Sequence, residues 1–137
     1  MNFFLQELKE EFGFYSSKRE LLEALMEYGK CLEELSLEFR TDEYKVPGCI
    51  SGVFITAELK DGKVFYKGFS ESFIVKGFVY ILFKALSGLT PKDIIDAEQT
   101  LKSFSKDTSL SASEITSRAN SFGNIYDFMK KKALFIK

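Results

Sequence analysis

Apolar residues in the first part of the chain recur every three or four positions, which is the spacing of one face of a helix. This spacing predicts a short helix over residues 3–12 and a longer one over residues 21–35. Ser17-Lys18-Arg19-Glu20 forms a capping box before the longer helix. The polar residues 36–47 follow as a connector. Each predicted helix has one apolar stripe, so both are expected to lie against a common core.

The pattern changes to alternation between residues 53 and 59, which is typical of a strand with one buried face. Asp61-Gly62 is a strong signal for a tight hairpin turn, and residues 63–69 return as a second strand. From residue 70 to Leu86 the apolar positions run nearly all round a helix, and Ser70 is its expected cap. Such a helix is predicted at the centre of the fold.

The C-terminal third is predicted to be mainly helical. Thr90-Pro91 opens a short helix, because proline in the first turn loses no hydrogen bond. Residues 96–110 are interpreted as a helix and a loop, and a last helix is predicted to start near residues 111–113. Its apolar face consists of Ile115, Ala119, Phe122, Tyr126, Met129 and Ala133. Together the elements predict an α+β fold, in which helices cover a small antiparallel sheet of about three strands mostly on one side.

Composition narrows the class of protein. A length of 137 residues, 45% of them hydrophobic, predicts a single domain over residues 1–137. Nineteen basic residues against 20 acidic ones argue against nucleic-acid binding, and Lys130-Lys131-Lys132 is interpreted as the complement of a helix C-terminus. The N-terminus lacks a signal-peptide pattern, and the apolar zone from Phe73 to Leu86 is too short to span a bilayer. The chain is therefore expected in the cytoplasm, without membrane contact.

The chain has two cysteines, Cys31 and Cys49, and no histidine. Two thiols are too few for a disulfide framework, for a zinc site without histidine, or for an iron–sulfur cluster held by this chain alone. No metal is therefore expected on this chain. Cys31 is expected to be a small buried apolar residue, late in the helix over residues 21–35.

Cys49 lies between a Pro47-Gly48 turn and the first predicted strand. Because the chain has no histidine as a base, this thiol suits a group that receives and hands on an atom better than one that hydrolyses a bond. Exchange between sulfur atoms needs only a modestly acidic thiol, and Gly48 frees the backbone beside it. The residues alone leave a second interpretation open, in which Cys49 is a small buried apolar residue.

The stretch around Cys49 resembles the SufE family, the sulfur acceptors of cysteine desulfurases. Val46-Pro47-Gly48-Cys49-Ile50-Ser51-Gly52-Val53-Phe54 is similar to the family pattern V-x-G-C-x-S-Q-V-W. Four further stretches follow the family's order and spacing, so the resemblance covers nearly the whole chain and implies a fold like that of SufE and IscU. They are Tyr28-Gly29-Lys30 with Phe39-Arg40-Thr41-Asp42-Glu43, Ser70-Glu71-Ser72-Phe73-Ile74-Val75-Lys76-Gly77, Ser87-Gly88-Leu89-Thr90-Pro91-Lys92-Asp93-Ile94-Ile95, and Ser117-Arg118-Ala119-Asn120.

The resemblance implies that Cys49 takes persulfide sulfur from a SufS-like, PLP-dependent cysteine desulfurase and passes it to an iron–sulfur scaffold protein. The chain would then be an accessory protein, a monomer or weak dimer, that stimulates the desulfurase. PLP would be bound by the partner, and no cofactor is expected here. Arg118 is expected either to favour the thiolate or to pair structurally with a carboxylate. The residues expected at the docking face are Gly48, Ile50, Ser51, Gly52, Glu71 and Lys76.

Three positions depart from the family pattern: Gly52 stands where Gln is usual, Phe54 where Trp is usual, and Ser121 where Gly is usual. The substitutions at Gly52 and Phe54 keep open an alternative in which the chain docks on a desulfurase, or on another sulfur acceptor, and regulates it without carrying sulfur. A thiol enzyme, such as a peroxide-reducing protein, is a third interpretation. It is weakened because no resolving cysteine or histidine lies near Cys49 in the sequence.

Overall fold

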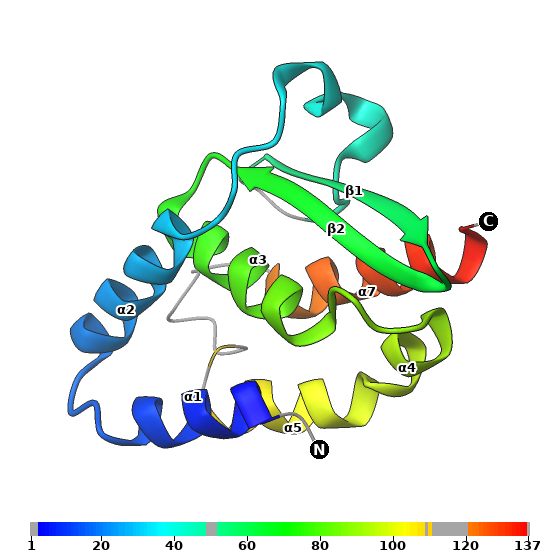
Figure 1. Ribbon diagram of the computed structural model, residues 1–137. Coiled ribbons are helices and arrows are strands. Elements are labelled where there is room, and N and C mark those ends of the chain that lie inside the picture. Colours follow the sequence, from blue (N-terminus) through cyan, green and yellow to red (C-terminus); the bar gives the residue numbers. More distant parts are fainter. Residues whose placement is uncertain (1–2, 49–51, 109, 111–120, 137) are drawn as a thin grey trace.

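The computed structural model describes residues 3–48, 52–108, 110 and 121–136. A two-stranded antiparallel sheet lies across one side of the molecule, and helices pack against the face that the sheet turns towards the core (Figure 1). The predicted α+β class is thereby confirmed. The sheet and the helices share one apolar cluster, which contains residues from both strands and from every α-helix that the structure describes.

Two helices begin the chain, as the apolar spacing predicts. α1 covers Phe3–Gly13 and α2 covers Lys18–Lys30. Ser17 caps α2, because its hydroxyl oxygen accepts a hydrogen bond from the Glu20 amide over 3.3 Å. The second hydrogen bond of the predicted capping box is made by the residue before the cap. The Glu20 carboxylate accepts hydrogen bonds from the amide and the hydroxyl of Ser16, not from the Ser17 amide.

The second helix is shorter than predicted and ends before Cys31. The spacing assigns Leu35 to this helix, but Leu35 lies in the connector and its side chain is buried there. Arg40 Nε donates a hydrogen bond to the Leu35 carbonyl oxygen over 2.9 Å and holds the connector against the core. Tertiary packing therefore overrides the helical spacing. The prediction that Cys31 is buried is wrong: it is the C-cap residue of α2 and is exposed.

The connector leads into the sheet. It contains two single-turn 3-10 helices, η1 (Leu37–Phe39) and η2 (Asp42–Tyr44). The strands β1 (Val53–Lys60) and β2 (Lys63–Ser70) pair antiparallel, with Val53 opposite Ser70. Asp61 and Gly62 both have positive φ angles, 53° and 77°, as a type I′ hairpin turn requires. The predicted hairpin is therefore confirmed.

The sheet has two strands where about three were predicted. On the outer edge of β1, Lys45 bridges to Phe54, and on the outer edge of β2, Leu89 bridges to Val64. Neither bridge grows into a strand within the described part of the chain. The segment before Lys45 turns into η2, and Pro91 starts the next helix directly after Leu89.

The central helix is α3 (Phe73–Leu86), as predicted from its apolar composition (Figure 1). It is buried on most sides, and the Phe78, Ile81 and Leu82 side chains are fully buried. Its N-cap is Ser72, whose hydroxyl oxygen accepts a hydrogen bond from the Val75 amide over 3.3 Å. The prediction of Ser70 as the cap is wrong, because Ser70 is the last residue of β2.

Three further helices complete the described fold: α4 (Pro91–Asp96), α5 (Glu98–Asp107) and α7 (Ser121–Phe135). α7 buries Phe122, Tyr126, Met129 and Ala133, which confirms that part of its predicted apolar face. Ile115, Ala119 and the predicted helix start at residues 111–113 lie outside the described residues.

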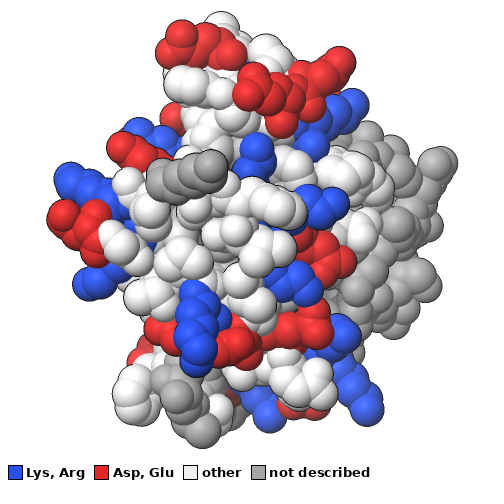
Figure 2. All heavy atoms as spheres, turned by 90° about the vertical axis from the view of Figure 1, so that its right-hand side faces the viewer, with Lys and Arg blue, Asp and Glu red and all other residues white. Residues whose placement is uncertain are grey.

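The surface of the described chain carries both signs of charge. On the face where α7 ends and the hairpin turns, basic and acidic side chains are interspersed around uncharged surface (Figure 2). No helix that the structure describes has the length and apolar character needed to cross a membrane.

Candidate functional site

The ends of the segment that carries Cys49 are fastened to the sheet. The Val46 amide donates a hydrogen bond to the Val53 carbonyl oxygen over 2.8 Å, and the Glu71 amide donates one to the Gly52 carbonyl oxygen over 3.1 Å. Val46 and Val53 are both buried. Residues 47–52 therefore start and finish at the same corner of the sheet, where β1 begins and β2 ends.

Gly48 and Asn124 make a further anchor for this segment. Asn124 lies in the first turn of α7, and its Nδ2 donates a hydrogen bond to the Gly48 carbonyl oxygen over 3.2 Å. Gly48 has a φ of 81°, a conformation that residues with a Cβ rarely adopt. A Cβ at this position would also lie 2.9 Å from Asn124 Nδ2. Gly48 is thus suited both to the backbone turn and to the close approach of α7.

Gly52, the last residue of the segment, packs closely against Glu71 and Phe54. A Cβ at Gly52 would lie 3.2 Å from the Glu71 carboxylate and 3.2 Å from the Phe54 ring. The space beside Gly52 is therefore largely filled by these two side chains. A glutamine at position 52, which is usual in the family pattern, would require both neighbours to move. The two departures from the family pattern, Gly52 and Phe54, are therefore coupled sterically.

A cationic–aromatic cluster, formed by Arg40, Phe69, Phe73 and Lys76, lies beside the start of α3. The Arg40 guanidinium is 3.7 Å from the centre of the Phe69 ring, and the Lys76 ammonium is 5.0 Å from it. Lys76 also lies 5.6 Å from the Phe73 ring, which is 57% exposed. Phe69 pairs with Phe54 across the sheet. Neither cation forms an ion pair with any described carboxylate, so the cluster presents positive charge beside exposed apolar surface.

The structure brings together part of the predicted site. Gly52 is next to Glu71 at the corner of the sheet, Gly48 is held by Asn124 in the same anchored segment, and Lys76 lies in the cationic–aromatic cluster. The sequence predictions did not include Asn124 and Arg40 among the site residues. Their positions depend on long-range contacts that no local spacing signals. The other predicted site residues, Cys49, Ile50, Ser51 and Arg118, lie outside the described residues and stay predictions.

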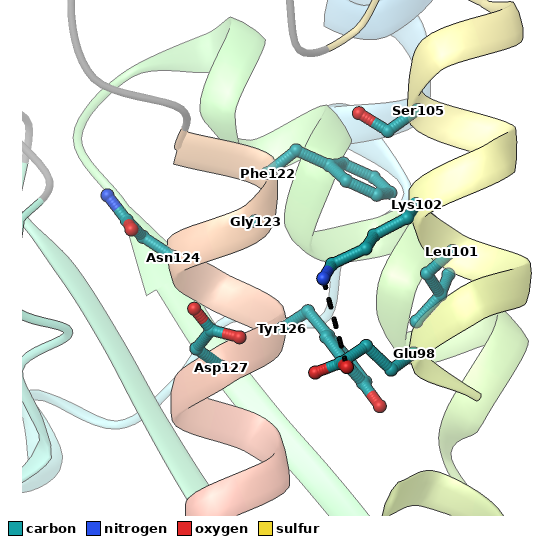
Figure 3. A pocket seen from close by; sticks show the side chains of 9 residues that line it. All are labelled: Glu98, Leu101, Lys102, Ser105, Phe122, Gly123, Asn124, Tyr126 and Asp127. Carbon is teal, nitrogen blue, oxygen red and sulfur yellow. Dashed lines mark ion pairs between the residues drawn. The ribbon is translucent and has the colours of Figure 1, made fainter. Parts of the chain in front are cut away.

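A cavity of about 270 Å³ lies between α5 and α7, and Asn124 forms part of its wall (Figure 3). Lys102 pairs with Glu98 along α5, on one wall of the cavity, over 3.8 Å (Figure 3). A hydrogen bond from Lys130, with the charge of Lys102, lowers the pKa of the Glu98 carboxyl. Ser105 Oγ is buried without a hydrogen-bond partner in the described part of the chain. Because the charges at the wall neutralise one another, the cavity favours neither an anion nor a cation.

No group of three or more histidine, cysteine, aspartate or glutamate residues that could hold a metal ion occurs among the described residues. The chemical content of the site is therefore a segment anchored to the sheet by its main chain, a helix that holds it through one amide side chain, and a nearby cationic–aromatic cluster. Such an arrangement can present a residue of this segment to another macromolecule while the fold behind it stays rigid.

Relatives of the chain share a family name. An uncharacterized SufE-like protein of Synechocystis sp. is 41% identical over 130 residues, which are 95% of this chain and 80% of that protein. SufE-like protein 1, chloroplastic/mitochondrial, of Arabidopsis thaliana is 34% identical over 97% of this chain, and a chloroplastic quinolinate synthase of Nicotiana tabacum is 27% identical over 93%. The chain spans only 35% and 18% of these two plant proteins. Since their names place them in organelles, the expected cytoplasmic location stays a prediction.

A solved structure and a family model agree with these relatives. The solution structure of a hypothetical protein from Thermus thermophilus has a TM-score of 0.67 and 20% identity, over 96% of each chain, and supports the fold alone. The family model for SufE, described as an Fe-S metabolism associated domain, matches residues 6–133. The chain therefore belongs to the SufE family, whose domain is associated with Fe–S metabolism.

Proposed function

We propose that this chain is a sulfur carrier. In this proposal Cys49 accepts sulfur as a persulfide from a PLP-dependent cysteine desulfurase, passes it to an iron–sulfur scaffold protein, and thereby stimulates the desulfurase. The observation that carries the proposal is the anchoring of residues 47–52, which hold the cysteine by sequence and are fastened at both ends to the sheet. The association of the family with Fe–S metabolism supports it.

The proposed transfer is a thiol exchange without net oxidation. The Cys49 thiolate attacks the outer sulfur of the partner's cysteine persulfide, and the bond between the two sulfurs of the partner breaks. The partner's cysteine leaves as a thiolate, and Cys49 now carries the persulfide. An ordinary cysteine has a pKa of about 8.5, so a few per cent is thiolate near neutral pH without any histidine base.

Docking on the desulfurase is assigned to the corner of the sheet. The cationic–aromatic cluster provides two unpaired positive charges and an exposed aromatic ring beside the anchored segment. Exposed aromatic and arginine side chains are frequent anchors of protein interfaces. We therefore expect the partner to bring an acidic and apolar surface to this corner. PLP stays on the partner in this scheme.

The proposal is tested by mass spectrometry. The chain is incubated with a cysteine desulfurase, PLP and cysteine, and intact masses are recorded before and after reduction. We expect one or more reducible sulfur atoms on the wild type and on Cys31→Ser, and none on Cys49→Ser. Cys31→Ser is a matched control because Cys31 is an exposed thiol on the same chain. An unmodified wild type, in a mixture where the desulfurase is active, would contradict sulfur transfer to this chain.

A second candidate is an interaction module that docks on the desulfurase without carrying sulfur. The specific observation in its favour is the altered corner, where Gly52 and Phe54 replace the usual residues and the side chains of Phe54 and Glu71 fill the space beside Gly52. Desulfurase turnover, measured in the same mixtures, separates the two candidates. Stimulation of the desulfurase that survives Cys49→Ser favours docking alone, whereas stimulation lost in Cys49→Ser favours sulfur transfer.

A further inference from the structure

Part of the outer edge of β1 has no partner among the residues that the structure describes. The Val53 carbonyl faces Val46, away from β2, whereas the Gly52 carbonyl faces β2. Because main-chain groups of successive residues alternate in direction, those of Ala57 and Leu59 also point away from β2. Within the described chain, neither residue makes a hydrogen bond on that side. We call residues 57–60 the vacant edge.

The edge is vacant because the chain leaves it. Lys45 bridges to Phe54 at the start of β1, and the residues before it turn into η2 instead of continuing along the strand. A vacant edge of four residues is about 13 Å long, since a strand rises about 3.3 Å per residue. Exposed edges of this kind accept strands from other chains unless they are covered.

A groove of about 440 Å³ runs beside the vacant edge, between Ala57 and the last turns of α7. Phe128, Phe135 and Ile136 give it an apolar lining, and Tyr44 of η2 also lines it. Phe135 is 72% exposed, so its ring is available to another molecule. The last turn of α7, whose residues line the groove, lies on the side of the molecule that Figure 2 turns to the viewer.

Two lysines line the same groove. The Lys132 ammonium lies 5.5 Å from the Tyr44 ring and 5.3 Å from the Phe128 ring. Neither Lys131 nor Lys132 forms an ion pair in the part of the chain that the structure describes. Their neighbour Lys130 differs, because it pairs with Glu98. The groove therefore combines apolar surface, two cations without counter-ions and vacant main-chain hydrogen-bonding groups.

We propose that the vacant edge and its groove bind an extended peptide segment of a partner protein, which carries apolar and acidic side chains on the same face. The segment adds to β1 as a further strand and hydrogen-bonds the main chain of Ala57 and Leu59. Alternate side chains of a strand point to opposite faces, so this face enters the groove as a whole. Its apolar side chains contact the apolar lining, and its carboxylates lie near Lys131 and Lys132. Strand addition of this kind takes affinity from the main chain and specificity from alternate side chains.

Charge favours a partner protein over a second copy of this chain. A second copy paired through the same edge would bring another Lys131 and Lys132 towards these two lysines, and like charges would repel. The site also does not depend on Cys49. It lies at the C-terminal end of α7, whereas Asn124 holds the anchored segment at the opposite end of that helix.

Defined peptides test the proposal. The probes are two fluorescein-labelled hexapeptides. One is Val-Thr-Glu-Thr-Ile-Thr, which places valine, glutamate and isoleucine on one face of a strand, and the other is the same peptide with lysine in place of glutamate. We expect the acidic peptide to bind at least about tenfold more tightly, and Lys131→Glu with Lys132→Glu to remove that preference. Lys18→Glu with Lys106→Glu is the matched control, because it changes the net charge equally at exposed positions on α2 and α5. Equal binding of both peptides would overturn the proposal.

Amide hydrogen exchange locates the bound peptide. With the acidic peptide in excess, we expect the Ala57 and Leu59 amides to exchange at least about tenfold more slowly, because they gain hydrogen bonds. The Glu58 amide faces β2 and should change little. Binding without protection of Ala57 and Leu59 would reduce the site to surface charge and overturn strand addition. Protection that grows with protein concentration in the absence of peptide would identify a second copy as the occupant, and would also overturn the proposal.

Discussion

The Gly48 carbonyl oxygen and the Asn124 side-chain amide join two residues that are 76 positions apart in the chain. This one hydrogen bond links the anchored segment to α7, and the positive φ of Gly48 turns the carbonyl to accept it. The contact is tight, because the space where a Cβ would lie at Gly48 is next to Asn124 Nδ2. The two residues are therefore expected to be coupled energetically.

Gly48→Ala is predicted to lower the free energy of unfolding by about 1–2 kcal/mol, because alanine is strained at positive φ and its Cβ meets Asn124. In an Asn124→Ala background the steric part is removed. The same substitution should then cost less, with a coupling of about 0.5–1 kcal/mol. Urea denaturation of the wild type, both single variants and the double variant measures this coupling.

Gly62→Ala is the matched control, since Gly62 also has a positive φ of 77° but a Cβ added there would have nothing within 4 Å. It should carry the backbone strain alone and show no coupling to Asn124. Strictly additive effects of Gly48→Ala and Asn124→Ala would contradict the proposed contact.

Local polar chemistry could be predicted from the sequence only where it acts between near neighbours. The cap at Ser17 was predicted correctly, because its hydroxyl bonds an amide three residues along. The cap at Ser72 was placed two residues too early, since Ser70 has the same chemistry and only strand pairing excludes it. Asn124 could not be predicted at all, because its partner Gly48 is distant in sequence.

At the scale of elements, α2 and α3 pack closely through two glycines. A Cβ at Gly29 would lie 2.7 Å from the Phe73 carbonyl oxygen, and one at Gly77 would lie 2.2 Å from the Leu25 carbonyl oxygen. Real side-chain atoms do not approach a main chain this closely. Gly29 and Gly77 therefore set the distance between the two helices, and the close packing helps to fix the central helix under the sheet.

Gly77→Ala is predicted to destabilise the fold by roughly 2–4 kcal/mol, although alanine favours a helix by about 1 kcal/mol. The cost arises because the added methyl group forces α2 away from α3. Gly13→Ala is the matched control at the end of α1, where a Cβ meets nothing within 4 Å, and it should be neutral or slightly stabilising. Thermal unfolding of both variants decides between packing and propensity. Equal melting temperatures would show that the two helices separate at little cost.

Most elements could be predicted from hydrophobic spacing, because each buries one face or all faces in the core. The hairpin and α3 are examples, and turn chemistry at Asp61-Gly62 adds to the signal. The end of α2 could not be predicted, since Leu35 keeps the helical spacing but reaches the core from the connector. The prediction of a third strand is wrong for a related reason. Lys45 pairs with β1, and tertiary structure then turns the chain away.

At the scale of the molecule, tyrosine hydroxyls join pairs of elements. Tyr66 of β2 donates a hydrogen bond to the Met129 carbonyl oxygen of α7 over 2.8 Å, and Tyr126 of α7 donates one to the Ile94 carbonyl oxygen of α4 over 2.6 Å. Tyr28 of α2 donates to the Glu11 carboxylate of α1 over 2.6 Å. Each contact requires the hydroxyl proton, so each is lost when the phenol ionises.

Burial raises the pKa of these tyrosines. Together with the charge of Glu98, it raises the pKa of Tyr126 to about 12, and burial raises the pKa of Tyr66 well above its usual range. The unfolded chain ionises its tyrosines near pH 10, so above that pH it binds fewer protons than the folded chain. Stability should therefore be complete below about pH 10 and fall between about pH 10 and 12.

The expected fall is about 1.4 kcal/mol per pH unit for each tyrosine that keeps its proton in the fold, and urea denaturation at pH 8 to 11 measures it. Tyr126→Phe should be less stable at pH 8 by about 1 kcal/mol, because it loses a buried hydrogen bond, but should show a shallower fall above pH 10. Tyr44→Phe is the control, since the Tyr44 hydroxyl makes no hydrogen bond in the described chain. If the stability of Tyr126→Phe falls in parallel with the wild type, another group titrates in this range, and the tyrosine contacts between elements do not set the alkaline limit of the fold.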